Sequence, residues 1–358
     1  MYSIYSDGEL IYAPNMVRSG YQVIAPKLKT EFEKVDVLTF QLPPGCRGYD
    51  IIKKRTSDVT VFDGDKPIFH GHCLDSQRGL LNTKSVKCEG ARAWLRDSVM
   101  RPYTFDDDTI SGSRNFWEKL LSNHNAQASA NRAIVAGAFG NYSRCHRSSE
   151  DYVSTLETME KFLAELIGGG HLVMRYEADA NRNITTYADR KAIWAVTGQV
   201  IQFGKNLLDI NEYLDTRNVY TVIIPVGKNG LTISGVNSGK DYLESEVGIK
   251  AWGRIWKVVY FRDITDASAL KSAAQSALED AIAEALTLKI RAIDLKRIGL
   301  SSYGLEMGSW HNVVSPPHGI NSAYQLTRIE TDMAQPERSI YEFGVSRKTL
   351  TQQITQGG

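Results

Sequence analysis

"DVTVFDGDKPIFHGHCL", residues 58–74, has the alternation of a β-hairpin. Val59 and Val61 alternate with polar residues, a turn follows around Gly64, and a second strand resumes near Phe69. An Asp-Gly turn between two such runs is one of the strongest local signals for antiparallel pairing. The stretch therefore predicts that the N-terminal part of the chain consists of short strands joined by turns.

Outward from this hairpin, residues 104–200 change to a mixed pattern, which predicts an α+β domain. Ser113 is a candidate cap of one helix, and a second helix is expected after Ser148-Ser149, ending at "GGG", residues 168–170. A further hairpin is expected over residues 171–187. The first helix should pack by one face, which consists of Phe116, Trp117, Leu120 and Leu121, and the second by a stripe of Val153, Leu156, Met159, Phe162, Leu163 and Leu166.

Strands return from residue 201, with one long helix between them. "YTVIIPVGKNGLTISGV", residues 220–236, predicts two strands, although Pro225 cannot donate a ladder hydrogen bond and belongs at an edge, a bulge or a strand end. The Ala- and Leu-rich segment 266–285 predicts a helix capped by Thr265 or Asp266. Its buried stripe should consist of Leu270, Ala274, Leu278 and Ile282. Residues 351–358 lose apolar patterning and are predicted to be a tail or linker stump.

Composition limits the function classes. The 358 residues include 42 Lys and Arg against 41 Asp and Glu, so no global basic field is available to hold nucleic acid or an anionic membrane. No stretch approaches the ~20 apolar residues of a membrane span, and the N-terminus lacks a signal-peptide pattern. Four cysteines without a CxxC pair indicate reduced, buried thiols rather than a disulfide scaffold: Cys46, Cys73, Cys88 and Cys145.

Candidate reactive groups form no recognisable catalytic motif. His70 and His72 share one strand face with Cys73 on the other, but two ligands do not make a zinc site, and half-exposed strand residues are the better interpretation. Cys145-His146 also supplies only two ligands, and we do not interpret it as a metal site. The acidic groups are interpreted as solvated loops and helix starts: Asp106-Asp107-Asp108, Glu150-Asp151 and Asp263/Asp266. We assign no catalytic, cofactor-binding or metal-binding residue.

Two other segments invite a binding interpretation. "GVNSGKD", residues 235–241, superficially resembles a phosphate loop, but the glycine spacing is short and no Ser or Thr follows Lys240, so a hairpin is the simpler prediction. The second segment combines aromatic and aliphatic residues: Trp252, Ile255, Trp256, Val258, Val259, Tyr260 and Phe261. We interpret these aromatics as filling a sheet–helix interface or an inter-subunit contact, rather than as a sugar platform.

The order of blocks from residue 201 to 350 resembles phage and prophage tail-tip hub proteins, the family often labelled prophage tail endopeptidase or tail-associated lysin. The blocks are "VIQFGKNLLDINEYLDTRNVYTVIIPVGKNG", "WGRIWKVVYFRDITDASAL", the long helix and "LEMGSWHNVVSPPHGINSAYQLTRIETDM". "DVLTFQLP" with "VTVFDGDKPIFHGHC" also looks like the N-terminal barrel of that family.

The resemblance implies a β-rich, multidomain α+β fold with two barrel-like β domains and an α+β domain, similar to phage baseplate hubs and type VI spike hubs. The predicted domains are a barrel-like domain at 1–103, the α+β domain at 104–200 and a second barrel-like region at 201–350 carrying the helix 266–285. In such hubs, Pro225 would end or bend a strand ladder where the chain turns.

The implied function is a non-enzymatic, homotrimeric hub at the virion tail tip, assembled in the bacterial host cytoplasm. It would join the distal tail protein or tail-tube ring to the tip and open for DNA, which passes without specific binding. The tape-measure protein and fibre or lytic modules are further candidate partners. Two alternatives stay open: a peptidoglycan-degrading tail enzyme using His70/His72 or a carboxylate, and a saccharide- or receptor-binding module using the tryptophan cluster.

Overall fold

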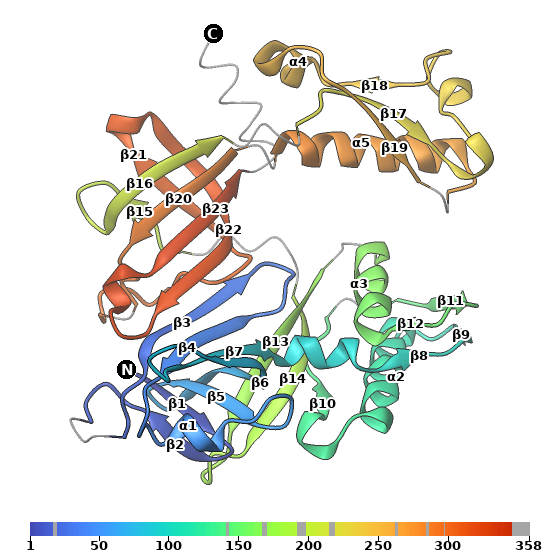
Figure 1. The fold of residues 1–358 in the computed structure, drawn as a ribbon. Coiled ribbons are helices and arrows are strands. Elements are labelled where there is room, and N and C mark those ends of the chain that lie inside the picture. Colours follow the sequence, from blue (N-terminus) through green and yellow to red (C-terminus); the bar gives the residue numbers. More distant parts are fainter. Residues whose placement is uncertain are drawn as a thin grey trace. The chain divides into compact units, whose positions relative to one another are not determined.

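The structure is a computed structural model, and it describes residues 1–16, 20–140, 143–166, 170–191, 198–214, 219–261, 264–283, 286–296 and 298–345. Two compact units are present (Figure 1): unit 1 comprises Met1–Ala195 with Arg328–Ser339, and unit 2 comprises Val196–Thr327 with Ile340–Gly358. The predicted β-rich α+β class is confirmed. The predicted domain boundaries at residues 103, 200 and 350 stay predictions.

The first part of unit 1 is a curled antiparallel sheet. The predicted hairpin at 58–74 is confirmed, because Val61 pairs with Phe69 and Asp63 with Lys66. In pairing order, the sheet runs through the last residues of β22 (Ile320–Asp332), then β3 (Ile24–Glu31), β4 (Val37–Leu42), β7 (Lys84–Gly90), β6 (Lys66–Arg78), β5 (Asp58–Asp63), β1 (Tyr2–Ser6) and β2 (Glu9–Tyr12). The short helix α1 (Gly48–Ile51) lies between β4 and β5 in the chain.

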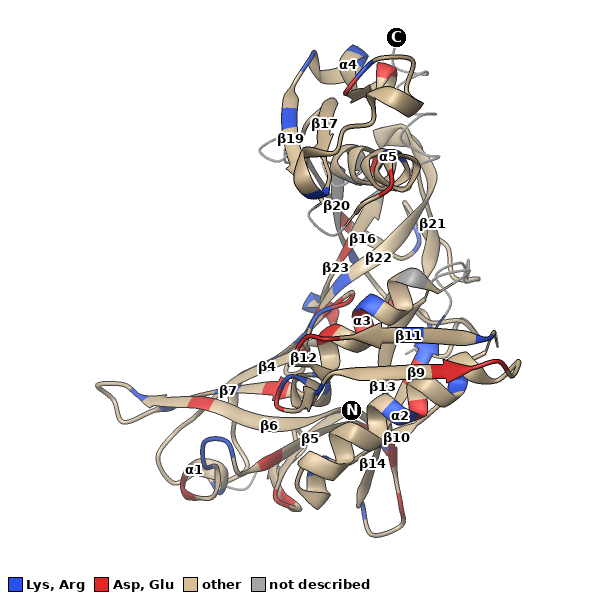
Figure 2. Ribbon diagram, turned by 90° about the vertical axis from the view of Figure 1, so that its right-hand side faces the viewer, with Lys and Arg blue, Asp and Glu red and all other residues tan. Residues whose placement is uncertain are grey.

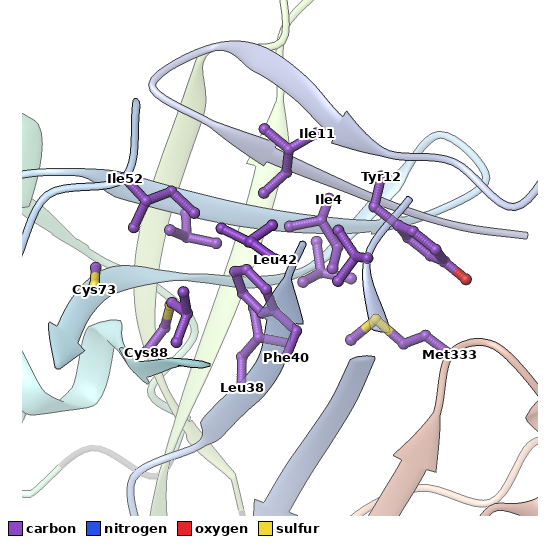
Figure 3. Packing of buried hydrophobic residues seen from close by; sticks show 14 of the residues in the cluster. Ile4, Ile11, Tyr12, Leu38, Phe40, Leu42, Ile52, Cys73, Cys88 and Met333 are labelled. Atoms are coloured by element: carbon purple, nitrogen blue, oxygen red, sulfur yellow. The ribbon is translucent and has the colours of Figure 1, made fainter. Parts of the chain in front are cut away.

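The inner face of this sheet forms one hydrophobic core (Figure 3), in which Ile4, Ile11, Leu38 and Leu42 are fully buried. Met333, which follows β22 in the chain, belongs to the same cluster. Each such aliphatic side chain contributes about 1.5–3 kcal/mol relative to an exposed one. An inside–outside alternation is present in β4 and β7, whereas the four central residues of β5 are all buried.

The second part of unit 1 has its own core, built by two helices and a hairpin. Leu120, Met159 and Phe162 are buried in it, together with Leu172 of the hairpin. The elements are the 3-10 turn η1 (Ala91–Arg96), β8 (Val99–Met100), β9 (Tyr103–Asp107), α2 (Gly112–Gln127), η2 (Ala130–Arg132), β10 (Ile134–Ala136), β11 (Cys145–Ser149), β12 (Val153–Ser154), α3 (Thr155–Glu165), β13 (His171–Ala178) and β14 (Ile184–Lys191).

α2 buries its predicted face, and α3 buries four of the six predicted residues, whereas Val153 lies in β12 and Leu166 follows the helix, and both are partly buried. Both predicted caps are wrong. Ser111 is the N-cap of α2, whereas Ser113 lies inside the helix and its hydroxyl accepts from the Ser143 amide at 3.0 Å. Ser148 and Ser149 belong to strand β11, and α3 is capped by Ser154, whose hydroxyl accepts from the Glu157 amide at 3.1 Å. Ser154-x-x-Glu157 is a capping-box sequence. The "GGG" end signal falls largely outside the described residues.

Unit 2 contains the remaining strands of the 13-stranded main sheet, which continues through β22. These strands are β15 (Ile201–Gln202), β16 (Leu207–Leu214), β20 (Leu286–Ala292), β21 (Trp310–Ser315), the first part of β22 and β23 (Ile340–Val345). β16 ends the sheet and pairs with β20 alone among the described named strands. Two 3-10 turns, η5 (Pro316–His318) and η6 (Pro336–Arg338), interrupt the chain before β22 and β23.

A small α/β lobe is inserted between β16 and β20 in the chain. It contains a three-stranded sheet with the order β18 (Leu243–Glu244), β17 (Val222–Val226), β19 (Trp256–Tyr260), together with α4 (Glu246–Trp252) and α5 (Ala267–Ala283). The predicted stripe of α5 is confirmed, because all four residues are buried. Asp266 accepts from the Ala269 amide at 2.7 Å and caps the helix. Residues 284 and 285 of the predicted helix lie outside the described residues.

The lobe explains Pro225. Val222 donates to the Ile255 carbonyl and Phe261 donates to the Val226 carbonyl, so alternate residues of β17, including Ile224, face β19. The nitrogen of Pro225 points to the other side, where β18 pairs only with Val222 and Ile223. The prediction that Pro225 lies where no ladder bond is needed is confirmed. The second strand predicted from Leu231 is wrong, because 3-10 turns η3 (Lys228–Gly230) and η4 (Ser234–Val236) occupy this stretch.

In the described part of the chain, no helix is long and apolar enough to cross a membrane.

Candidate functional site

The two histidines of β6 are buried, so their interpretation as half-exposed strand residues is wrong. His70 is 6% and His72 0% exposed. His70 Nδ1 lies 2.9 Å from the Thr186 hydroxyl, and the Trp94 indole donates to His72 Nδ1 at 3.0 Å. The Trp94 ring also meets the His70 ring at 5.0 Å between centroids. Both histidines lie on one strand face, as predicted, and both contact the buried Trp94.

Burial also removes the charge from these histidines near neutral pH. Desolvation lowers the pKa of His70 to about 4, and the pKa of His72 is lowered by burial and by the nearby positive charges of Arg132 and Arg55. Cys73 and Cys88 pair across β6 and β7, and both are fully buried, as predicted for free thiols. Burial raises the pKa of Cys88 well above its ordinary value. A buried neutral thiol is a poor nucleophile.

A set of buried and partly buried polar side chains connects the two cores of unit 1. We define the junction cluster as Asp36, His70, Arg92, His171 and Tyr176. Arg92 donates to the Leu172 carbonyl at 3.0 Å and to Glu160 Oε1 at 2.6 Å. The rings of His70 and Tyr176 lie 6.2 Å apart. The cluster thus joins the turn before β4, strand β6, η1 and β13 through charged and aromatic groups.

The pKa values in the junction cluster are shifted mainly by burial. Desolvation raises the pKa of Asp36 to about 7, against the opposing effects of the Arg92 charge and a hydrogen bond from Thr30. Desolvation, with the charges of Lys191 and Arg92, lowers the pKa of His171 to about 4. The pKa of Tyr176 is raised for the same reason, with Asp36 adding to the shift. No local sequence signal marked Asp36, Arg92 or Tyr176.

The acidic run Asp106–Asp108 and the candidate His146 come together at the β9–β11 pair. His146 lies 3.3 Å from Asp106 and 3.3 Å from Asp108, and all three side chains are more than half exposed. Figure 2 shows the acidic run at this end of β9. Within the described residues, no group of three or more His, Cys, Asp or Glu could hold a metal ion. The interpretation of these acids as solvated groups agrees with their exposure.

The remaining acidic predictions have structural roles or cannot be described. Glu150 and Asp151 lie on an exposed turn before β12. Asp266 caps α5, whereas Asp263 lies outside the described residues.

The loop with a phosphate-loop appearance connects two antiparallel strands. β17 and β18 pair antiparallel, which agrees with the hairpin interpretation. Asn237 closes the loop by donating to the Tyr242 carbonyl at 2.8 Å, and the Lys240 ammonium lies over the Tyr242 ring. No helix follows Lys240 directly, because β18 comes next. The arrangement lacks the strand–loop–helix order of a phosphate-binding loop.

The aromatic segment 252–261 is exposed, so its interpretation as sheet–helix filling is wrong for the strand itself. Trp256 is 51%, Val258 46% and Tyr260 66% exposed. The physical reason is the position of α5, which packs on β17 and β18 and leaves β19 uncovered. The Trp256 ring meets Tyr242 edge-on at 5.2 Å. This strand is the most apolar exposed element of the lobe.

Comparisons with known proteins agree with this architecture. Residues 195–354 match the family model described as prophage endopeptidase tail. No curated protein sequence matches the chain. Among solved structures, the fold resembles the 43 kDa tail protein of prophage MuSo2 from Shewanella oneidensis, with a TM-score of 0.64 and 12% identity over 98% of this chain and 99% of that one.

Two further tail proteins share the fold over nearly their whole length. The tail protein from Neisseria meningitidis aligns with a TM-score of 0.57 and 14% identity, covering 96% of each chain. Prophage tail protein gp18 from Listeria monocytogenes aligns with a TM-score of 0.54 and 12% identity, covering 99% of this chain and 98% of that chain. Residues 195–354 thus match the prophage tail family in sequence, and the whole chain shares the fold of these three tail proteins. The resemblance to the prophage tail family is thereby confirmed, in sequence for residues 195–354.

Proposed function

We propose that the chain is a non-enzymatic hub at the virion tail tip, where copies form a closed homotrimeric ring below the tail tube or distal tail ring. The observation that carries this proposal is the tail-protein fold, which the three alignments described above follow over 96–99% of the chain, with the strands of the main sheet divided between two compact units. Two such units per chain let a threefold ring present six modules to a sixfold partner.

Charge distribution supports passage of DNA without binding. The net charge is +1, and Figure 2 shows Lys and Arg interspersed with Asp and Glu in both units. Most ion pairs among the described residues lie at the surface, where each positive charge is balanced by a nearby negative one, as in Lys27–Glu330 and Arg96–Glu89. A conduit needs such balance, because an ordered basic groove would hold phosphates and slow transit.

The peptidoglycan-hydrolase alternative loses its two best groups. His70 and His72 are enclosed by Trp94 and Thr186, and burial lowers the pKa of both, so neither is presented to a polysaccharide. If the chain were a hydrolase that acts through a carboxylate, the wild type would give a clearing zone on host peptidoglycan and Asp107→Ala would not. Asp107 is chosen because the acidic residues on both sides of it are exposed. We expect no clearing zone from either protein.

Light scattering of the purified protein tests the assembly. We expect a mass of three copies of the 39.9 kDa chain, either alone or after mixing with the distal tail protein. A complex with that partner should give a defined stoichiometry of three copies per ring. A protein that stays at the mass of one chain in both conditions would contradict the trimeric hub.

A further inference from the structure

Strand β19 has one edge without a partner strand among the described residues. It lies at the end of the order β18-β17-β19 and pairs with β17 in a regular parallel register. Because the Ile255 carbonyl and the Phe261 amide bond to β17, the backbone groups of Lys257 and Val259 also face β17. The N–H and C=O groups of Trp256, Val258 and Tyr260 therefore point away from the sheet.

The same three residues expose apolar side chains on one face. Trp256, Val258 and Tyr260 are about half exposed or more, and Tyr242 extends the apolar face beside Trp256. Natural edge strands are usually protected by proline, a bulge, inward charges or a covering helix. β19 has no proline, its register has no bulge, and α5 packs on the other two strands. Only Lys257 acts as a protecting charge.

The charges around β19 favour an acidic partner strand. Residues 247–261 contain Lys250, Arg254 and Lys257 and no Asp or Glu. Arg254 is paired with Glu244 at 2.8 Å, and the Lys257 ammonium lies 4.8 Å from the Tyr220 ring centroid, which leaves a positive charge at the open edge. An extended segment with acidic residues between apolar ones would pair with this edge and be attracted to it.

The chain itself contains a strand of this kind, β16, with a second edge that has no partner strand among the described residues. β16 has the sequence "LLDINEYL", with Asp209 and Glu212 and no basic residue, and it ends the sheet of unit 2. Leu208 is 51% exposed, and the carboxylate of Asp209 is 58% exposed and forms a surface ion pair with Arg291 at 3.6 Å. Such an exposed pair is weak, so Asp209 stays accessible to a second cation. β16 is longer than β19, so the five residues of β19 could pair fully with it.

We propose that β19 of one copy adds to the open edge of β16 in the next copy. The contact is heterologous, since two different edges meet, and repeated contacts of this type close into a ring when the rotation between copies permits. This inference rests on the proposed self-association and identifies the surface that carries it. Main-chain hydrogen bonds supply the attachment, and the acidic–basic pairing selects β16 over other edges.

A synthetic peptide of residues 206–214, NLLDINEYL, tests the contact with the full chain. Trp256 provides the fluorescence readout, and calorimetry gives the affinity. We expect binding to the wild type and at least about tenfold weaker binding to Val258→Pro. This proline removes an amide on the open edge and leaves the β17–β19 bonds intact. Val258→Ala, which keeps the amide, is the matched control and should bind more tightly than the proline variant.

Charge exchange gives a second test that does not depend on the fold of the proline variant. A peptide with Lys at both acidic positions should bind the wild type more weakly than the natural peptide does. The Lys257→Glu protein should reverse this order. Equal binding of both peptides to both proteins would contradict the role of charge in choosing β16.

The outcomes separate this inference from the proposed function. If the natural peptide does not bind at about 1 mM and Val258→Pro assembles like the wild type, the surface is wrong, whereas a trimeric mass would still support the hub. If the wild-type protein is monomeric but binds the peptide through β19, the surface is supported and the homotrimer is contradicted. If neither binding nor assembly is observed, both proposals fail.

Discussion

Strands β6 and β19 carry similar sequence patterns but have opposite environments. β6 lies between β5 and β7, and its aromatic and imidazole groups are packed against Trp94 and the core. β19 has one neighbour, and its Trp256 and Tyr260 are exposed. The number of neighbouring strands and the helix coverage decide the exposure of each strand, so an alternating apolar pattern can mark either a core strand or an adhesive edge.

The largest expected effect concerns β6, the buried strand of this comparison. Phe69 on β6 is fully buried, so Phe69→Ala should lower the free energy of unfolding by about 3–5 kcal/mol, because a large cavity forms. Trp256→Ala on β19 should lower it by less than about 1 kcal/mol, since this side chain is half exposed. Urea denaturation followed by circular dichroism measures both. Equal losses would mean that β19 is buried in the folded protein.

A second effect separates the two edges of β17. Ile224 faces β19 through its backbone, so Ile224→Pro removes a ladder bond and should destabilise the lobe by about 3 kcal/mol. Pro225→Val adds an amide beyond the end of β18 and should change the stability by less than about 1 kcal/mol. Hydrogen exchange of the β17–β19 amides reports the difference. A large loss in Pro225→Val would contradict the assigned direction of its nitrogen.

A third effect concerns pH in the buried region. The folded pKa of Asp36 is about 7, above its ordinary value of 3.8, so the folded state holds a proton that the unfolded state has already released. Stability should therefore fall as pH rises from about 4 to 7. Asp36→Asn should remove this slope and raise the free energy of unfolding at pH 8, on the order of 2 kcal/mol. Denaturation at pH 5 and pH 8 measures it, and an unchanged slope would contradict the enclosure of this carboxyl.

The smallest effect has the opposite sign with pH. The folded pKa of His70 is about 4, below its ordinary value of 6.5, so the unfolded state binds a proton first and stability falls as pH drops from about 6.5 to 4. His70→Gln can keep the bond to Thr186. It should reduce the loss of unfolding free energy between pH 6.5 and pH 4 by roughly 1 kcal/mol. Trp256→Ala at the open edge should leave the slope unchanged. An identical acid slope in His70→Gln would contradict the assignment.

Local signals in the sequence predicted the elements well and their environments less well. The hairpin at 58–74 and the stripe of α5 follow from spacing alone, and the structure confirms both. The exposure of His72 depends on Trp94, which lies 22 residues away in the sequence. The exposure of Trp256 depends on which strands α5 covers, and no spacing rule gives that.

The helix caps failed for a similar reason. Two serines, Ser111 and Ser113, lie at the start of α2, and Ser148, Ser149 and Ser154 precede α3. For α3, the choice between them depends on where the neighbouring strands end. Ser148 and Ser149 are held in the β9–β11 pair, which leaves Ser154 to cap α3. The junction cluster could not be predicted at all, because Asp36, Arg92 and Tyr176 are isolated in the sequence and meet only after the two cores of unit 1 pack.

The central claim is that the chain is located at the tail tip. Immunogold electron microscopy of particles induced from the host that carries this sequence tests it most directly, using antibodies against the purified protein. We predict one gold label at the distal end of each tail, and no label along the tube or on the capsid. Labelling along the tube, or particles with complete and labelled tips after deletion of the coding sequence, would contradict the claim.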